Sequence, residues 1–480
     1  MSEEIVVESA GNSVKRKISG KVIGIIAGGV TLVIAGVGVS IALLTGGGAQ
    51  PEDVLPRDTV AMAKIDFSPK IGQRINLVRF LSQFPKNIEN FDQEDPVGSI
   101  LDQLDLSSEI DWDEIQPWIG NRYAVAVVES AGELNPVIVL SIKDELEMKY
   151  YFNKNFPELD YEVMLDYVLI ADNKSVLNVI TSAPSQLSEN ENYKSDMDTL
   201  GGDQIASVWA NLKPISRYAD DWIDEYFYNQ GLDQNTDSLK NNDGRVAVGM
   251  HFTPDSFVTD IVTVGVNDGD IEVDQQSRSL DIIGDLPSDI FGVLSLDGIG
   301  KAFTGALLDN SLGREILSDI GISERDFGLL FDGPLAILAV NDGRRSDPLI
   351  LARMEPVNPA KTLEALKRVL SQNGYYPEDI DSIVRADGKF IYLGEDDESL
   401  RRGISALKSG ALPLRDNEQF KNALTEPGNL SLFVNLDTLL DKIDFDTNDA
   451  PLGALGMSIG ADSEKSGVSR SKITISLKSD

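Results

Sequence analysis

An uncharged segment from Val22 to Leu44 constrains this chain more than any other part of its sequence. As an α-helix it would extend ~34 Å at ~1.5 Å per residue, enough to cross the ~30 Å hydrocarbon core of a bilayer. Four basic residues lie just before it, and acidic residues follow it. Since basic flanks stay in the cytoplasm, we expect residues 1–21 to be a cytoplasmic tail and 22–45 a transmembrane anchor. The remaining chain would then lie outside the cytoplasm, held at the cell membrane through Val22–Leu44.

A cleaved signal peptide is the alternative interpretation of this segment. Gly47 and Ala49 are small enough for a cleavage site, but the apolar segment exceeds the ~7–15 residues of a signal core. Gly24 and Gly28 have the spacing at which two membrane helices approach closely. Glycine is also common in membrane helices, so the sequence leaves the oligomeric state open.

Composition limits the class of the remaining chain. The protein has 480 residues, 42% of them hydrophobic, which is too long for one ordinary core once the anchor is removed. Its net charge of −36 would repel nucleic acid and anionic lipid, so we expect no nucleic-acid partner. The same charge also serves solubility alone. The absence of cysteine favours a bacterial envelope over a eukaryotic secretory route and excludes cysteine nucleophiles, thiolate zinc sites and iron–sulfur clusters.

The sequence after the anchor echoes itself, which indicates an internal duplication. Leu55-Pro56 precedes one strand-like segment, and Leu286-Pro287 precedes another. Further matches follow in the same order: 190–194 with 417–421, 209–212 with 433–436, and 249–250 with 456–457. We therefore expect a linker at 46–53, a first repeat at 54–267, a second linker at 268–282 and a second repeat at 283–480.

Within the first repeat, the hydrophobic pattern alternates between the periods of strands and helices. The expected strands are 60–65, 123–128, 137–142, 163–171, 205–210, 246–252 and 257–266; the expected helices are 71–84, 146–156, 175–181 and 215–227. Strand pairs around short polar turns indicate hairpins. The predicted fold class is α+β: an N-terminal transmembrane helix followed by two tandem repeats of mostly antiparallel sheet with packed helices.

Four of the strand-like segments end in an acid or amide, at Asp66, Asn211, Asp297 and Asn435, and a helical pattern follows each. Asp and Asn are leading N-cap residues, so we expect four helix caps. The alternative is that these side chains line a common cleft.

Several motifs resemble a known family. Leu55-Pro56 before a strand, the segment Ile115–Gly120 (Ile-Gln-Pro-Trp-Ile-Gly) and the single anchor resemble bacterial membrane-anchored proteins catalogued only as a domain of unknown function. The resemblance implies an envelope role but no activity, cofactor or site residue. The second repeat departs from the motif, with Phe331-Asp332-Gly333 in place of Trp-Ile-Gly.

Few residues indicate chemistry. His251 is the only histidine; alternation places it on one strand face with Ala247 and Gly249, opposite Phe252. Its expected counterpart in the second repeat is Ser458. One histidine cannot form a histidine-based metal site, and no nucleophile and orienting acid stand beside it as a catalytic triad requires.

Other motifs lack their context. Ser405–Lys408 and Lys465–Gly467 match elements of penicillin-binding enzymes, but the intervening Ser-x-Asn is missing. The loops 233–237 and 444–448 carry oxygen ligands without the glycine and glutamate of a calcium loop, so at most they would bind a cation loosely. The acids of Glu395–Glu398 fit a helix start. We therefore predict no catalytic, cofactor-binding or metal-binding residue and no cofactor.

These observations predict a single-pass, extracytoplasmic protein with a non-enzymatic binding or envelope-organising role and an envelope protein as its partner. One alternative is an extracytoplasmic hydrolase that uses a carboxylate pair or a bound cation, because acids abound. Another is a carrier of lipid or another apolar ligand, held between the sheets of each repeat.

Overall fold

The computed structural model describes residues 48–84, 111–201, 203–216, 243–266, 277–298, 314, 317–318, 321–343, 348–426, 428–442, 451–461 and 467–478. The predicted anchor Val22–Leu44 lies outside these residues. Within the described ranges, no helix is long and apolar enough to cross a membrane.

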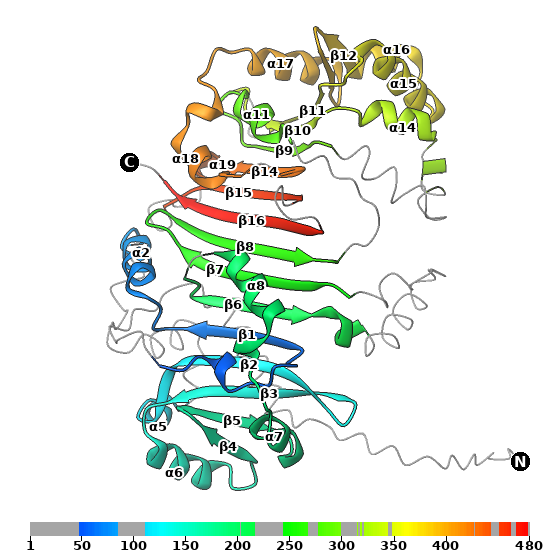
Figure 1. Cartoon of the computed structure of the whole chain (residues 1–480). Helices are drawn as coiled ribbons and strands as arrows, with labels where there is room; N and C mark the ends of the chain where they lie inside the picture. The colour runs from blue at the N-terminus through cyan, green and yellow to red at the C-terminus, as the bar shows by residue number, and fades with distance from the viewer. Residues whose placement is uncertain are drawn as a thin grey trace, which may run out of the picture.

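One antiparallel sheet of 16 strands organises the described chain, as Figure 1 shows. Helices lie on both of its faces, so the fold is α+β with a large antiparallel sheet, as the sequence predicted. The two expected repeats do not have separate sheets, because the strands of residues 61–264 and those of residues 292–477 share this one.

The N-terminal half comprises residues 48–266. Its strands are β1 (Ala61–Asp66), β2 (Ile119–Ser130), β3 (Glu133–Ile142), β4 (Tyr161–Met164), β5 (Tyr167–Ala171), β6 (Ala206–Asn211), β7 (Arg245–Phe252) and β8 (Ser256–Val264). Its helices are η1 (Pro51–Asp53), α2 (Ile71–Leu81), α5 (Trp112–Ile115), α6 (Glu145–Asn155), α7 (Lys174–Thr181), η2 (Leu187–Glu189) and α8 (Glu191–Leu200).

The C-terminal half comprises residues 277–478. Its strands are β9 (Gly292–Leu296), β10 (Leu335–Val340), β11 (Leu349–Met354), β12 (Val384–Asp387), β13 (Phe390–Leu393), β14 (Leu430–Asn435), β15 (Leu452–Ala461) and β16 (Val468–Leu477). Its helices are α11 (Ser279–Gly284), α14 (Glu324–Leu330), α15 (Pro359–Gln372), α16 (Pro377–Ile383), α17 (Asp397–Leu407), η3 (Leu414–Asp416), α18 (Glu418–Ala423) and α19 (Leu436–Lys442).

The strands of the two halves run in the same order from the sheet edge to its middle. The N-terminal order is β4-β5-β3-β2-β1-β6-β7-β8, and the C-terminal order is β12-β13-β11-β10-β9-β14-β15-β16. The halves meet where β8 pairs with β16, from Ser256 opposite Ser476 to Val264 opposite Val468. The last strands of the two halves, β8 and β16, therefore form the seam in the middle of the sheet.

A row of directly paired residues crosses this seam and shows the shared register. Asp260 lies opposite Lys472 at the seam. Outward from Asp260 the row continues through Gly249, Ser207, Lys64 and Ala124, and outward from Lys472 through Ser458, Ser431, Ser295 and Ala336. By this register Ser458 corresponds to Gly249. The sequence predicted that Ser458 corresponds to His251, which lies two residues further along β7.

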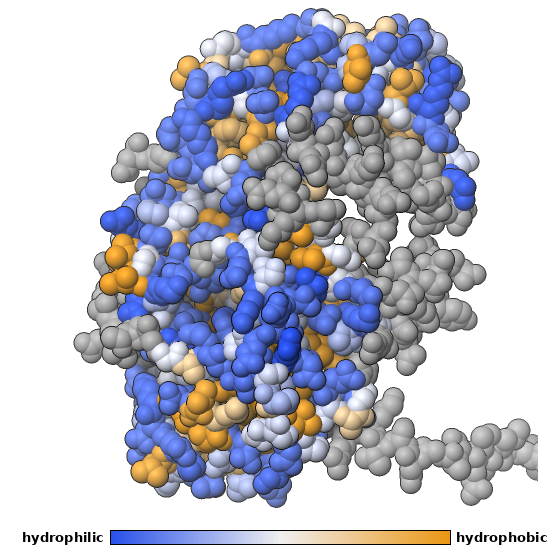
Figure 2. Space-filling model, in the orientation of Figure 1, coloured by the Kyte–Doolittle hydropathy of each residue, from blue (hydrophilic) through white to orange (hydrophobic). Residues whose placement is uncertain are grey.

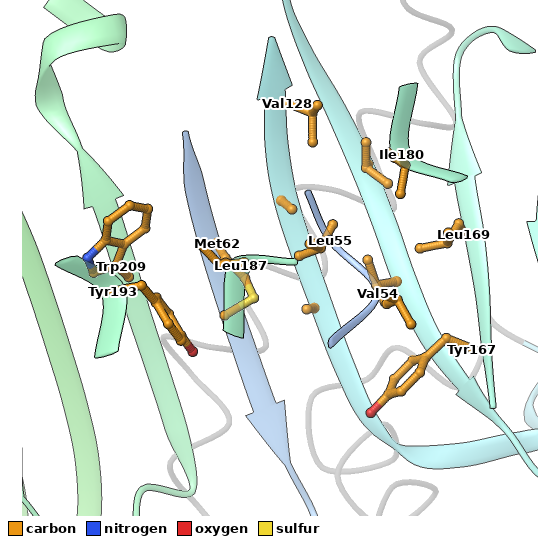
Figure 3. Packing of buried hydrophobic residues seen from close by; sticks show 14 of the residues in the cluster. Val54, Leu55, Met62, Val128, Tyr167, Leu169, Ile180, Leu187, Tyr193 and Trp209 are labelled. Atoms are coloured by element: carbon orange, nitrogen blue, oxygen red, sulfur yellow. The ribbon is translucent and has the colours of Figure 1, made fainter. Parts of the chain in front are cut away.

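Helices on each face bury one set of strand residues. On the face that carries the row, α7 and α8 cover the N-terminal half, and α11, α17 and α18 cover the C-terminal half. On the other face, α5, α6 and α2 pack on the first half and α14, α15 and α16 on the second. Figure 3 shows the first core, in which Leu55, Met62 and Leu187 lie near Tyr193 and Trp209.

The Leu-Pro motifs hold both halves in the same way. The backbone nitrogen of Leu187 donates to the carbonyl of Leu55 over 2.8 Å, and that of Leu414 donates to Leu286 over 2.7 Å. All four leucines are at most 1% exposed. The motif therefore ties the chain before the first strand to the turn that begins α8 or α18.

Most of the predicted elements occur within the described chain, but three differ from expectation. The expected helix 215–227 lies outside the described residues after position 216. The expected strand 163–171 is a hairpin of β4 and β5, because Leu165 adopts a left-handed φ of 54° and turns the chain. Helix α8 was not predicted. Helix α11 begins at Ser279, inside the range expected to be a linker, and Ile283 is fully buried there.

The four expected N-caps divide into two outcomes. The Asn435 side chain accepts from the backbone nitrogen of Thr438 at the start of α19, and Asn211 accepts from Lys213, where a helical turn begins. Asp66 does not cap α2, whose N-cap position is Lys70. Asp297 accepts from the backbone nitrogen of Arg278 instead. Asp66 therefore lies outside a helix start and the two amides lie at helix starts, whereas Asp297 binds the N-cap residue of α11 and the segment expected to be helical after it, from residue 299 on, lies outside the described residues.

We predict that Gly456→Ala destabilises the protein by about 3 kcal/mol, at the upper end of ordinary overpacking. A Cβ at this position would lie 1.9 Å from the carbonyl oxygen of Ala423, at the end of α18. Urea denaturation of both variants would measure this. The control is Gly72→Ala on α2, where a Cβ meets nothing within 4 Å and should add about 0.5–1 kcal/mol of stability. Equal stability of the two variants would contradict the close approach of α18 to β15.

Candidate functional site

A polar pocket of about 560 Å³ lies in the N-terminal half, between the sheet and α8. Its volume falls within the ~300–1,000 Å³ of small-molecule sites. The lining comes from five segments of the chain: η1 with the residues before it, the end of β1 with the loop to α2, Arg122 of β2, η2 with α8, and the loop from α8 into β6. A smaller pocket of about 190 Å³ adjoins it and shares Gly48, Ser68 and Arg122.

Two ion pairs form the floor of the pocket. Lys64 of β1 contacts Glu52 of η1 over 2.5 Å, with side chains only 15% and 13% exposed. Two residues along the same strand face, Asp66 pairs with Arg122 of β2 over 3.2 Å. Alternation along β1 explains why Lys64 and Asp66 point to the same side.

Helix α8 forms the opposite wall through Tyr193, Lys194, Met197 and Asp198. Its Asn190 N-cap accepts from the backbone nitrogens of Asn192 and Tyr193, which fixes where the helix begins. Burial raises the pKa of Tyr193 far above its usual value, and the nearby Glu52 carboxylate raises it further. The Tyr193 phenol is therefore a neutral group at the pocket wall.

A buried charge holds α8 against the sheet. Asp196 is 2% exposed and accepts from Trp209 Nε1 over 3.0 Å. Arg245 of β7 completes the pairing with Asp196 through Nε over 2.7 Å and Nη2 over 3.1 Å. Bidentate pairs of this kind add geometric specificity, so the position of α8 over the pocket is well defined.

The first described residues reach the pocket at its rim. The carbonyl of Ala49 accepts from the buried Tyr167 hydroxyl over 2.8 Å, and Arg122 also donates to it. Gly48 lines both pockets, and Lys70, which pairs with Asp203 over 2.6 Å, lines the larger one. The chain therefore joins the folded body beside the pocket.

Two of the pocket's charged positions are uncharged in the C-terminal half, whereas Asp66 is matched there by another acid, Asp297. On the paired row, Ser295 takes the place of Lys64. Ile283, three residues before the Leu-Pro motif as Glu52 is, is fully buried.

Helix α18 shows the same substitution of polar by apolar groups. Counted from its Asn417 cap, Phe420 and Ala423 stand where α8 has Tyr193 and Asp196. Phe420 packs edge-to-face on Phe433, as Tyr193 does on Trp209. Both of the pockets described above lie in the N-terminal half.

The difference between the charged residues of one half and the uncharged residues of the other bears on whether the ion pairs serve stability or function. A buried ion pair often contributes less stability than well-packed apolar residues of similar size. The C-terminal half reaches the same strand order with Ile283 and Ser295 in these places, so the fold does not require the charges. The pocket is therefore the best candidate for a functional site.

His251 lies at the seam, away from this pocket. Its Nδ1 is 3.3 Å from Asp260 Oδ2. Lys472 is 3.7 Å from the other oxygen of Asp260 and also pairs with Glu426. Burial lowers the pKa of His251, although Asp260 opposes this, and burial raises the pKa of Asp260. The cluster joins β7, β8 and β16, and none of its four residues is a serine or threonine that could complete a catalytic triad.

The remaining sequence candidates do not converge on a site. Ser405 is exposed on α17, and Lys408 pairs with Asp387. Asp396 caps α17 by accepting from the backbone nitrogen of Ser399 over 2.6 Å, as the sequence indicated. The loops 233–237 and 444–448, and Lys465 with Ser466, lie outside the described residues. In the part of the chain that the structure describes, no cluster of three or more acids and histidines could hold a metal.

Comparison with known proteins found no matching family model, no curated protein and no solved structure. The assignment of a function therefore rests on the geometry of this molecule.

We predict that Lys64→Ser alone destabilises the protein by about 3 kcal/mol, because it leaves the Glu52 carboxylate buried without its cation. The double variant Glu52→Ile with Lys64→Ser reproduces the residues of the C-terminal half. We expect its stability to lie within about 1 kcal/mol of the wild type or above it. Denaturant titration of all three proteins measures these differences. A double variant less stable than Lys64→Ser would show that the charges are structural.

We also predict that the protein loses stability as the pH falls from about 7.5 to 5.5, and that His251→Gln removes part of this loss. Because the folded-state pKa of His251 is lowered, the unfolded chain binds its proton more readily, so acid favours unfolding. The effect is at most about 1.4 kcal/mol per pH unit. Since His251 is the only histidine, the difference between the two proteins isolates its contribution. Parallel pH profiles would contradict the burial of this imidazole.

Proposed function

We propose that this chain is a single-pass membrane protein whose extracytoplasmic body binds a small polar ligand in the pocket between β1, η1 and α8, without chemical conversion. The body consists of two tandem repeats, of which the N-terminal one carries the binding site. An envelope location and a protein partner in the envelope are parts of the same proposal.

The observation that carries the proposal is the Glu52–Lys64 pair in this pocket, where the other half has the buried, uncharged residues Ile283 and Ser295 at the corresponding positions. Equal strand order and the equivalent Leu-Pro contacts support the duplication. Against that background, charges kept in only one half are explained by a ligand that needs them.

The chemistry of the pocket favours a ligand with several hydrogen-bonding groups. Its lining includes four cationic side chains, Lys64, Lys70, Arg122 and Lys194, and five acidic ones, Glu52, Asp53, Asp66, Asp198 and Asp203. Charges of both signs in one pocket suit a ligand that presents donors and acceptors together, such as a zwitterion or a sugar. Bulky apolar ligands would leave these groups unsolvated.

The hydrolase alternative gains one argument, because five acids converge on this pocket. However, Glu52, Asp66 and Asp203 each face a cation. These three carboxylates already have partners within the protein. Binding is therefore the better-supported function.

The carrier alternative assumed a cavity between two sheets in each repeat. In the described ranges there is one sheet, and its two faces are occupied by separate clusters of packed side chains. We do not propose lipid carriage between sheets.

The test is a thermal-shift screen of the full-length protein in detergent against amino acids, dipeptides, sugars and cell-wall fragments. A ligand at 100 times its Kd should stabilise the wild type by about 2.7 kcal/mol. The same compound should leave the Glu52→Ile, Lys64→Ser double variant unchanged, because we expect that variant to keep the fold and it lacks the Glu52–Lys64 pair of the pocket floor. A compound that shifts both proteins equally would contradict the proposed site, and conversion of the compound would favour the hydrolase.

A further inference from the structure

Helix α2 presents an apolar surface to solvent. Ile71, Ile75 and Val78 are 75%, 46% and 41% exposed. Their spacing places them on one side of the helix, while Leu77 and Phe80 on the opposite side pack against Phe252 and Leu477. Figure 2 shows hydrophobic residues at the left edge of the hydrophilic surface, where Figure 1 places α2.

Basic residues flank this apolar stripe. At ~3.6 residues per turn, Arg74 and Arg79 fall on either side of the line through Ile71, Ile75 and Val78. Lys70 precedes the helix with a side chain that is 77% exposed. From Ser68 to Ser82 the sequence contains no acid, although the whole chain has a net charge of −36. An apolar stripe between cations is typical of helices that lie in the interface of a bilayer.

The position of α2 relative to the chain's entry supports the same partner. Lys70, directly before α2, lines the same pocket as Gly48. Ala49 is fixed to the body by Tyr167 and Arg122. Gly48 follows the apolar segment ending at Leu44 so closely that the intervening chain spans at most ~14 Å. If Val22–Leu44 crosses the membrane, this end of α2 is close to the lipid headgroups.

We infer that α2 docks on the bilayer surface, with Ile71, Ile75 and Val78 in the headgroup boundary and Arg74 and Arg79 on anionic lipid. This inference rests on the membrane anchor of the proposed function. Most of the acidic body would be repelled by such a surface, so docking through α2 would also set the orientation of the body and its pocket. The apolar stems of the arginines can lie along the interface while their charges remain in the headgroup layer.

The experiment uses the absence of cysteine from the chain. Full-length protein with Ile75→Cys is labelled with an environment-sensitive fluorophore and reconstituted in vesicles containing anionic lipid and a headgroup-depth spin-labelled quencher. The matched control is Leu146→Cys on α6, which is 80% exposed and lies between Glu145 and Glu147. We expect the label at position 75 to be quenched and the label at position 146 to remain bright.

A charge variant tests the lipid chemistry. Adding Arg79→Glu to the labelled Ile75→Cys protein changes the charge by two units. Because each basic residue near an anionic surface contributes about 1 kcal/mol, this should lower the ratio of docked to undocked helix roughly 25-fold, with a matching loss of quenching. Replacing the anionic lipid by a zwitterionic one should weaken quenching of the unmodified helix in the same direction.

The outcomes separate the helix from the anchor. Protein that resists alkaline extraction but leaves the label at position 75 unquenched overturns the docking of α2 and retains the anchor. Equal quenching of the labels at positions 75 and 146 overturns the docking of α2, because it indicates unspecific adsorption. If the label at position 75 is not quenched by lipid but is shielded from solvent as the protein concentration rises, a second copy of the chain covers α2 and the inference is overturned. Protein that is extracted from the vesicles by alkali overturns both the anchor and this inference.

Discussion

The pairing of β8 with β16 is the interaction on which the rest of this structure depends. It joins two sets of eight strands into one sheet, and Asp260 meets Lys472 at its middle. Each of these strands is the second strand of the last hairpin in its half. The backbone hydrogen bonds between β8 and β16 therefore join corresponding parts of the chain. The helices on each side then pack on a sheet face that is continuous across the β8–β16 seam. The pocket, the seam cluster and α2 all take their positions from this common sheet.

Local elements could be predicted because their patterns are local. The hairpin of β7 and β8 follows from strict alternation on either side of Thr253-Pro254. The split between β4 and β5 was missed because Leu165 gives no glycine or proline signal for its turn. Helix α8 was not predicted because its polar residues, including the buried Asp196, interrupt the apolar periodicity of the face that packs on the sheet. The β8–β16 pairing could not be predicted, because nothing in the sequence of either strand indicates which strand it pairs with.

The candidate site could be predicted only in part. Glu52, Lys64, Arg122 and Tyr193 are far apart in sequence, and only the strand order brings them to one pocket. A usable signal was nevertheless present. The alignment of Leu55 with Leu286 also sets Glu52 against Ile283 and Lys64 against Ser295, so that two opposite charges are exchanged together for uncharged residues. The two residues exchanged together, Glu52 and Lys64, are in contact in the structure.

The short strands at the ends of the sheet have a consequence for assembly. With β8 and β16 joined, the outermost strands are β4 and β12, each of four residues. An isolated half would instead expose a seam strand nine or ten residues long, and long open edges recruit further chains. In the full-length protein β8 and β16 instead satisfy each other's backbone hydrogen bonds within one molecule, and only the short strands β4 and β12 remain at the edges of the described sheet.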